Sequence, residues 1–183
     1  ISDNSTNFQV SLVRAVSRMN AVFVSFTWDT PDGERVRRPH GHPVATFGMP
    51  SNTVEGSGGG VNHREHIMTM QLQLGSKLTP ETEVSSLGDF FDNLQQAIDT
   101  YDQSLRTVAI TPRMYNTNSF IAGFNLARVP GHHFASGINT RTGDLLVIKR
   151  QHLLPGMRNL RVYVNILYEG ILEVRESGCS FYD

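Results

Sequence analysis

The stretch NLRVYVNILYEGILEVRESGCSFYD, residues 159–183, decides the fold that the sequence predicts. Its first part alternates apolar with other side chains, and the apolar set is Leu160, Val162, Val164 and Ile166. Because successive side chains of a strand point to opposite sides, this pattern predicts a strand with one face in a core. Gly170 interrupts the run, which predicts a bend before a second extended segment at 171–176. Strands this apolar need neighbours, so we expect them to dock between other strands and to close the fold on its C-terminus.

Six segments further upstream are also predicted to be strands, because they alternate or are rich in β-branched and aromatic residues. They are residues 8–16, 21–28, 66–75, 105–111, 119–128 and 143–150. A single helix through 10–24 is the alternative for the first two segments. Asn20 and the density of Val, Phe and Thr around it favour strands.

Residues 86–101 are the one segment with a clear helical period. Ser86 followed three residues later by Asp89 is typical of a helix N-terminus. Apolar residues then recur at helical spacing, at Leu87, Phe90, Phe91, Leu94, Ala97, Ile98 and Tyr101. The acidic residues between them, such as Asp92, could hold a metal, but a solvated helix face explains them more simply.

The pattern therefore predicts an all-β fold, an eight-stranded jelly-roll sandwich with one amphipathic helix at about 86–101. A chain of 183 residues fits a single domain over 1–183. Residues 29–62 contain four prolines and a Gly-Ser tract, which predicts a long irregular loop. Since the sequence starts at Ile1 and not at Met, we expect a fragment of a longer chain.

Charge and composition narrow the possible partners. The formal net charge is −1, whereas a protein that binds nucleic acid through phosphate contacts is usually more basic. No nucleic-acid motif is visible, and no apolar run approaches the roughly 20 residues that a membrane-spanning helix needs. The single Cys179 excludes an internal disulfide and is interpreted as a packing residue.

Paired histidines are the most suggestive chemical feature, and the pairs that could bind a metal are His40 with His42 and His132 with His133. A cupin, which is itself a jelly roll, would place a glutamate soon after a His-x-His pair. Here the next acid after His42 is Glu55. No Gly-x-Ser-x-Gly elbow is present either. The sequence therefore predicts no catalytic residue, no bound metal, no cofactor and no enzyme, with loop histidines as the simpler reading.

Four segments taken in order resemble the C-terminal part of a double jelly-roll viral major capsid protein, of the type found in polinton-like elements, adintoviruses and virophages. The segments are QLGSK before Pro80, FFDNL at 90–94, FIAGFNL at 120–126 with SGINTRTGDL at 136–145, and ILEVRESGC at 171–179. The last segment carries Glu176 where the family pattern has Asp, and the loop at 29–62 has no match in length. The resemblance covers roughly residue 21 to the end of the chain.

What the resemblance implies is assembly. It implies a structural capsid subunit that associates with itself into homotrimeric capsomers and an icosahedral shell, with other capsid proteins as further partners. The subunit would be assembled in the host cell and located in the virion. Candidate interface residues are Arg141, Asn139, Thr140 and Trp28. The first three lie in a turn-prone link, and Arg141 offers a planar fork of hydrogen-bond donors.

Two other functions remain open at this point. A jelly-roll binding module, such as a lectin-like attachment domain, would use an exposed polar or aromatic cluster, for which Trp28 is a candidate. A cupin-like metal-dependent enzyme would use His40 and His42, with His132 or His133 as a further ligand.

Overall fold

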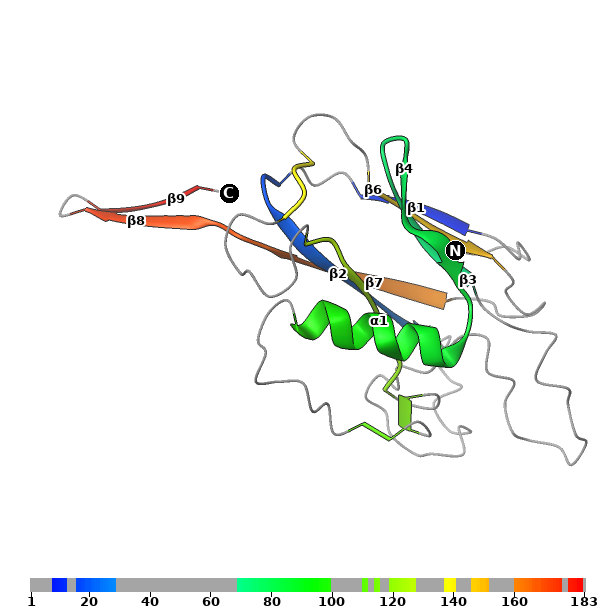
Figure 1. Ribbon diagram of the computed structural model, residues 1–183. Coiled ribbons are helices and arrows are strands. Elements are labelled where there is room, and N and C mark those ends of the chain that lie inside the picture. The colour runs from blue at the N-terminus through cyan, green and yellow to red at the C-terminus, as the bar shows by residue number, and fades with distance from the viewer. Residues whose placement is uncertain are drawn as a thin grey trace, which may run out of the picture.

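The computed structural model describes the backbone of residues 8–12, 16–28, 69–99, 110–111, 114–115, 119–127, 137–140, 146–151, 160–175 and 178–182. These ranges contain nine strands in three antiparallel sheets and one long helix (Figure 1). The predicted loop at 29–62 lies outside them. The all-β class with one amphipathic helix is confirmed, and the described ranges alone contain nine strands, where eight were expected for the chain.

The largest sheet has four strands. In spatial order they are β1 (Phe8–Leu12), β6 (Leu146–Gln151), β3 (Thr69–Leu74) and β4 (Lys77–Val84). Every neighbouring pair in this sheet is antiparallel. Along β3, Met70, Leu72 and Leu74 are buried, as the alternation at 66–75 predicts.

The second sheet has three strands and the third has two. The second has the order β5 (Ala122–Asn125), β2 (Met19–Trp28) and β7 (Leu160–Tyr168). The third is a hairpin of β8 (Ile171–Arg175) and β9 (Gly178–Tyr182). Going along the chain, β1 lies in the first sheet, β2 in the second, β3 and β4 in the first, β5 in the second, β6 in the first and β7 in the second.

Helix α1 (Leu87–Asp99) follows β4 and packs against β5. Its N-terminus is capped as predicted, since the Asp89 amide donates to Ser86 Oγ at 3.0 Å and the Ser86 amide donates to Asp89 Oδ2 at 3.3 Å. The helix lies close to the strand because Gly123 has no side chain. A Cβ atom at Gly123 would stand 2.8 Å from the Leu94 Cα atom, closer than real Cβ contacts.

One cluster of buried apolar side chains joins α1 to both larger sheets. Phe120 lies in the middle of its aromatic part. The centroid of its ring is 5.3 Å from that of Phe90, 5.2 Å from Tyr115 and 6.3 Å from Phe26. Full burial of one such ring stabilises the fold by roughly 1.5–3 kcal/mol. The α1 end of the second sheet is therefore the densely packed part of the molecule.

Three sequence-based expectations need correction. Residues 77–84 form β4, although no strand was expected between residue 75 and the helix. Residues 178–182 form β9, which was not expected either. The terminal strands do not dock between others in the described part of the chain, because β7 is the end strand of its sheet and β8 pairs with β9.

Candidate assembly surfaces

The β8–β9 hairpin is the feature that stands apart from the rest of the molecule. It continues from the end of β7 and projects beyond the two larger sheets (Figure 1). Its strands pair in register from Ile171 opposite Tyr182 to Arg175 opposite Gly178. Gly178 has φ of +142°, a conformation that side-chain-bearing residues rarely adopt, and it begins the returning strand. Within the described residues, neither β8 nor β9 pairs with a strand of the two larger sheets.

The two faces of this hairpin differ in chemistry. Since directly opposite residues share a face, the register places Leu172 and Val174 together with Phe181 and Cys179. None of these four side chains is charged. We call this set, Leu172, Val174, Cys179 and Phe181, the apolar face of the hairpin.

The other face carries a salt bridge. Arg175 Nη2 lies 2.7 Å from Glu173 Oε1, and Arg175 Nε donates to the same oxygen at 2.8 Å. Both charged side chains are therefore engaged within β8. This face also carries Ile171 and Tyr182, which are 59% and 54% exposed, so the salt bridge makes it the more polar of the two faces without making it wholly polar.

The apolar face is exposed to water. The exposed fraction is 61% for Leu172, 69% for Val174 and 60% for Phe181, and Cys179 is exposed as well. A two-stranded hairpin is marginally stable alone in water, and contiguous exposed apolar side chains are typical of an interaction surface. The hairpin therefore has the properties of an element that another protein surface covers.

The base of the hairpin is held to the body by polar contacts. The Glu169 amide donates to the Arg18 carbonyl at 3.0 Å, and Asn20 Nδ2 donates to Glu169 Oε1 at 2.7 Å. Arg18 Nη1 adds a contact of 3.7 Å to Glu169 Oε2. Next to this base, Gly170 leaves room for the Phe181 ring, since a Cβ there would collide with Phe181 Cζ. The hairpin is anchored at its root while its apolar face stays uncovered.

The predicted interface residues fall in different places. Thr140 is 5% exposed, and its hydroxyl accepts from the Val16 amide at 2.9 Å and donates to the Val16 carbonyl at 3.1 Å. Its polar group therefore joins two parts of the same chain, which is not what an interface anchor on the surface would do. Asn139 is exposed beside it. Trp28 ends β2, its side chain is outside the described part, and Arg141 lies outside the described residues altogether.

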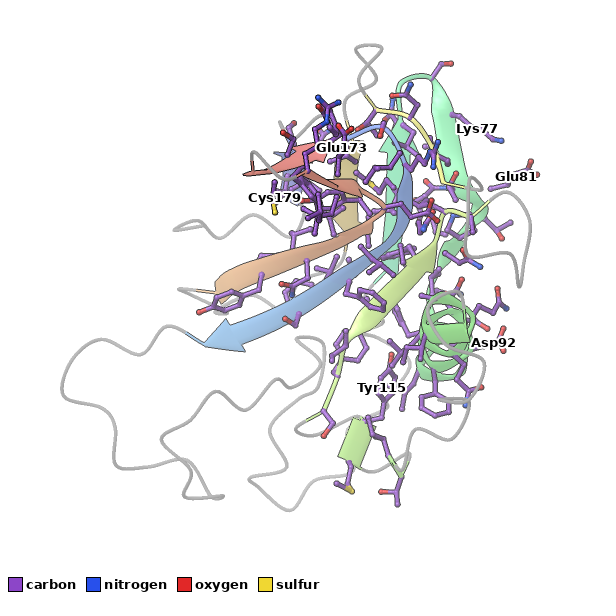
Figure 2. The ribbon with its side chains drawn as sticks, turned by 90° about the vertical axis from the view of Figure 1, so that its left-hand side faces the viewer. Lys77, Glu81, Asp92, Tyr115, Glu173 and Cys179 are labelled. Atoms are coloured by element: carbon purple, nitrogen blue, oxygen red, sulfur yellow. The ribbon has the colours of Figure 1, made fainter. Side chains whose placement is uncertain are left out.

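The described part of the chain gives little support to the hypothesis of a bound metal ion. The candidate ligands His40, His42, His132 and His133 all lie outside it. Within the described ranges, no three histidine, cysteine or carboxylate side chains lie close enough together to hold a metal ion. Asp92 lies on the side of α1 that faces away from β5, as expected for a solvated helix face (Figure 2).

Tyr115 is the described group whose protonation the fold perturbs most, and its role is structural. Burial raises the pKa of the Tyr115 hydroxyl well above its ordinary value. The hydroxyl donates to the Ile121 carbonyl at 2.8 Å, and the ring packs edge-on against Phe91 with centroids 5.1 Å apart. A tyrosine held neutral in this way stabilises the core and is a poor acid or base.

The sequence itself contains a signal for the apolar face. Leu172 and Val174 alternate with Glu173 and Arg175, so an extended conformation separates apolar from charged side chains. Phe181 repeats the pattern after a short Glu-Ser-Gly link. Two short alternating segments around such a link indicate a hairpin.

Comparison with known proteins gave no relative: no protein family model, no curated protein sequence and no solved structure matches this chain. None of the helices in the described ranges is long and apolar enough to cross a membrane.

Proposed function

We propose that this chain is a structural subunit of a viral capsid, which associates with copies of itself into trimeric capsomers and a shell. The proposal starts from the sequence resemblance and from the arrangement of the strands. In this proposal the chain functions in assembly and not in catalysis, and it is located in the virion.

The pairing order of the strands supports a jelly-roll body. A jelly roll can be described as an antiparallel ribbon of strands wrapped into two facing sheets. Here β3 pairs with β4, β2 with β5 and β1 with β6, which is the nested pairing of such a ribbon. The chain also alternates between the two larger sheets, as wrapping a ribbon requires.

The observation that carries self-association is the apolar face of the hairpin. In the proposed assembly this face packs against a second copy of the chain, because the hairpin reaches away from its own body (Figure 1). A second copy is the partner that repeated, symmetric assembly calls for. Covering Leu172, Val174 and Phe181 would stabilise the contact by about 1.5–3 kcal/mol for each side chain that becomes fully buried.

The test is negative-stain electron microscopy of the protein made from its complete reading frame. We expect shells, or particles with a hexagonal outline and threefold symmetry. A protein that remains monomeric across a range of salt concentration and pH would contradict the proposal.

A further inference from the structure

The side of the hairpin that lies opposite the apolar face is exposed as well. The register places on it Ile171, Glu173, Arg175, Ser180 and Tyr182, and we call this set the second face of the hairpin. Ile171 is 59% exposed and Tyr182 is 54% exposed. Large apolar side chains of the hairpin are therefore open to water on both of its sides.

The second face changes in character along the hairpin. Next to the root, Ile171 and Tyr182 lie directly opposite each other and form an apolar pair. Nearer the tip, the charges of Glu173 and Arg175 compensate each other, because 2.7 Å separates Arg175 Nη2 from Glu173 Oε1. An uncharged surface that packs on the second face would therefore cover the apolar pair and would meet charges only as a paired salt bridge.

The size of the apolar face argues that it does not suffice for a stable contact on its own. A stable, specific interface buries about 800 Å² on each partner. One aromatic side chain buries about 150–250 Å², and the apolar face holds one aromatic ring and three smaller side chains. Its total is therefore roughly 300–500 Å². Covering the second face as well would bring the buried area of the hairpin close to the required size.

The symmetry of the contact determines whether both faces are used. A twofold contact between two apolar faces would leave the second face of each copy in water. In a closed ring, one patch of each copy packs against a different patch of the next copy, so every copy uses both of its patches. The hairpin offers two unlike faces, and it projects far enough from the body for both to be reached (Figure 1).

We infer that the apolar face of each hairpin packs on the second face of the hairpin in the next copy, so that three hairpins close a ring on the threefold axis of the capsomer. This inference rests on the proposed function and names the surface that receives the apolar face. Ile171 and Tyr182 are the contact residues of that surface. The salt bridge between Glu173 and Arg175 lies toward the end of the ring that the hairpin tips form.

A complementation experiment with two variants of the complete protein tests the inference. Ile171→Asp places a charge in the second face, and Val174→Asp places one in the apolar face. Each variant alone should self-associate more weakly than wild type by on the order of 100-fold. In an equimolar mixture, the intact apolar face of one variant meets the intact second face of the other.

Sedimentation velocity should then show a 1:1 pair in the mixture. The pair should form at least 10-fold more tightly than either variant associates with itself, and it should not grow to a trimer. It should remain weaker than the wild-type assembly, because closing the ring makes the last contact intramolecular. Leu78→Asp, which adds the same charge on β4, should associate like wild type.

The outcomes separate this inference from the proposed function. If Ile171→Asp associated like wild type while Val174→Asp did not, the second face would be no contact and the inference would be wrong, although the capsid proposal would stand. A mixture that stayed monomeric would also overturn the inference. Wild-type protein that stayed monomeric would overturn both. If Ile171→Asp failed to fold, Tyr182→Ser would decide, since it should weaken association by about 10-fold without adding a charge.

Discussion

The two ends of the β5-β2-β7 sheet are built in opposite ways. At the β5 end, α1 lies so close that only glycine fits at position 123, and Phe120 is fully buried among aromatic rings. At the β7 end, the core-facing side chains are partly exposed, and the chain continues into a hairpin whose apolar face no described residue covers. The β5 end is therefore fully packed by residues of the same chain, whereas the β7 end exposes apolar side chains that the proposed partner would cover.

The largest expected difference is between two phenylalanines, one at each end. Phe120→Ala should lower the free energy of unfolding by about 3–5 kcal/mol, because it leaves a cavity among packed rings. Phe181→Ala should cost less than about 1 kcal/mol in the monomer, because its ring is 60% exposed. Urea unfolding at low protein concentration measures both. Equal losses of unfolding free energy in the two variants would mean that the hairpin is part of the folded core. That result would contradict the difference between the two ends of the sheet.

A smaller effect is expected where the helix meets β5. Gly123→Ala should destabilise the fold by about 1–3 kcal/mol, because the new methyl group would meet the Leu94 backbone and the Ala97 side chain. Gly88→Ala is the matched control, since a Cβ there meets nothing closer than 3.7 Å and alanine favours the helix. The control should be neutral or stabilising by up to about 1 kcal/mol. Thermal unfolding of the two variants gives the comparison, and a harmless Gly123→Ala would contradict the close contact.

The smallest effect concerns the region near the root of the hairpin. Thr140→Val should cost about 1–2 kcal/mol, because the buried Val16 amide loses the hydroxyl that it donates to. Thr140→Ser keeps the hydroxyl and should restore most of the loss. Unfolding of the monomer is the measurement. If Thr140→Val left stability unchanged but weakened self-association, then Thr140 would be an interface residue after all, as the sequence first suggested.

The sequence predicted those parts of the fold that depend on local periodicity. The helix followed from the spacing of Phe90, Leu94 and Ala97 and from the Ser86–Asp89 cap, which are features of one segment. The alternation in β7 was also correct, with Val162, Val164 and Ile166 toward the core and Tyr163 and Asn165 exposed.

The remaining features depend on tertiary structure. No strand was expected at 77–84, a segment that contains Pro80, but β4 is an end strand, where a missing amide costs little. The apolar residues at 171–174 were expected to dock between strands, because composition shows that a segment needs cover without showing what supplies it. Thr140 was named as an interface candidate, and its hydrogen bonds to Val16 could not be predicted because Val16 lies 124 positions away in the sequence.

The most direct test of the account is sedimentation velocity of the complete protein in three forms: wild type, Val174→Asp and Leu78→Asp. Leu78 is an exposed apolar residue on β4 and serves as the control for adding a charge. Val174→Asp places a carboxylate in the apolar face, so the dissociation constant for self-association should rise by on the order of 100-fold or more. The free energy of unfolding of the monomer should stay unchanged, and Leu78→Asp should associate like wild type. If Val174→Asp associated as tightly as wild type, the hairpin would not be the assembly contact. That result would contradict the central claim that the apolar face mediates self-association.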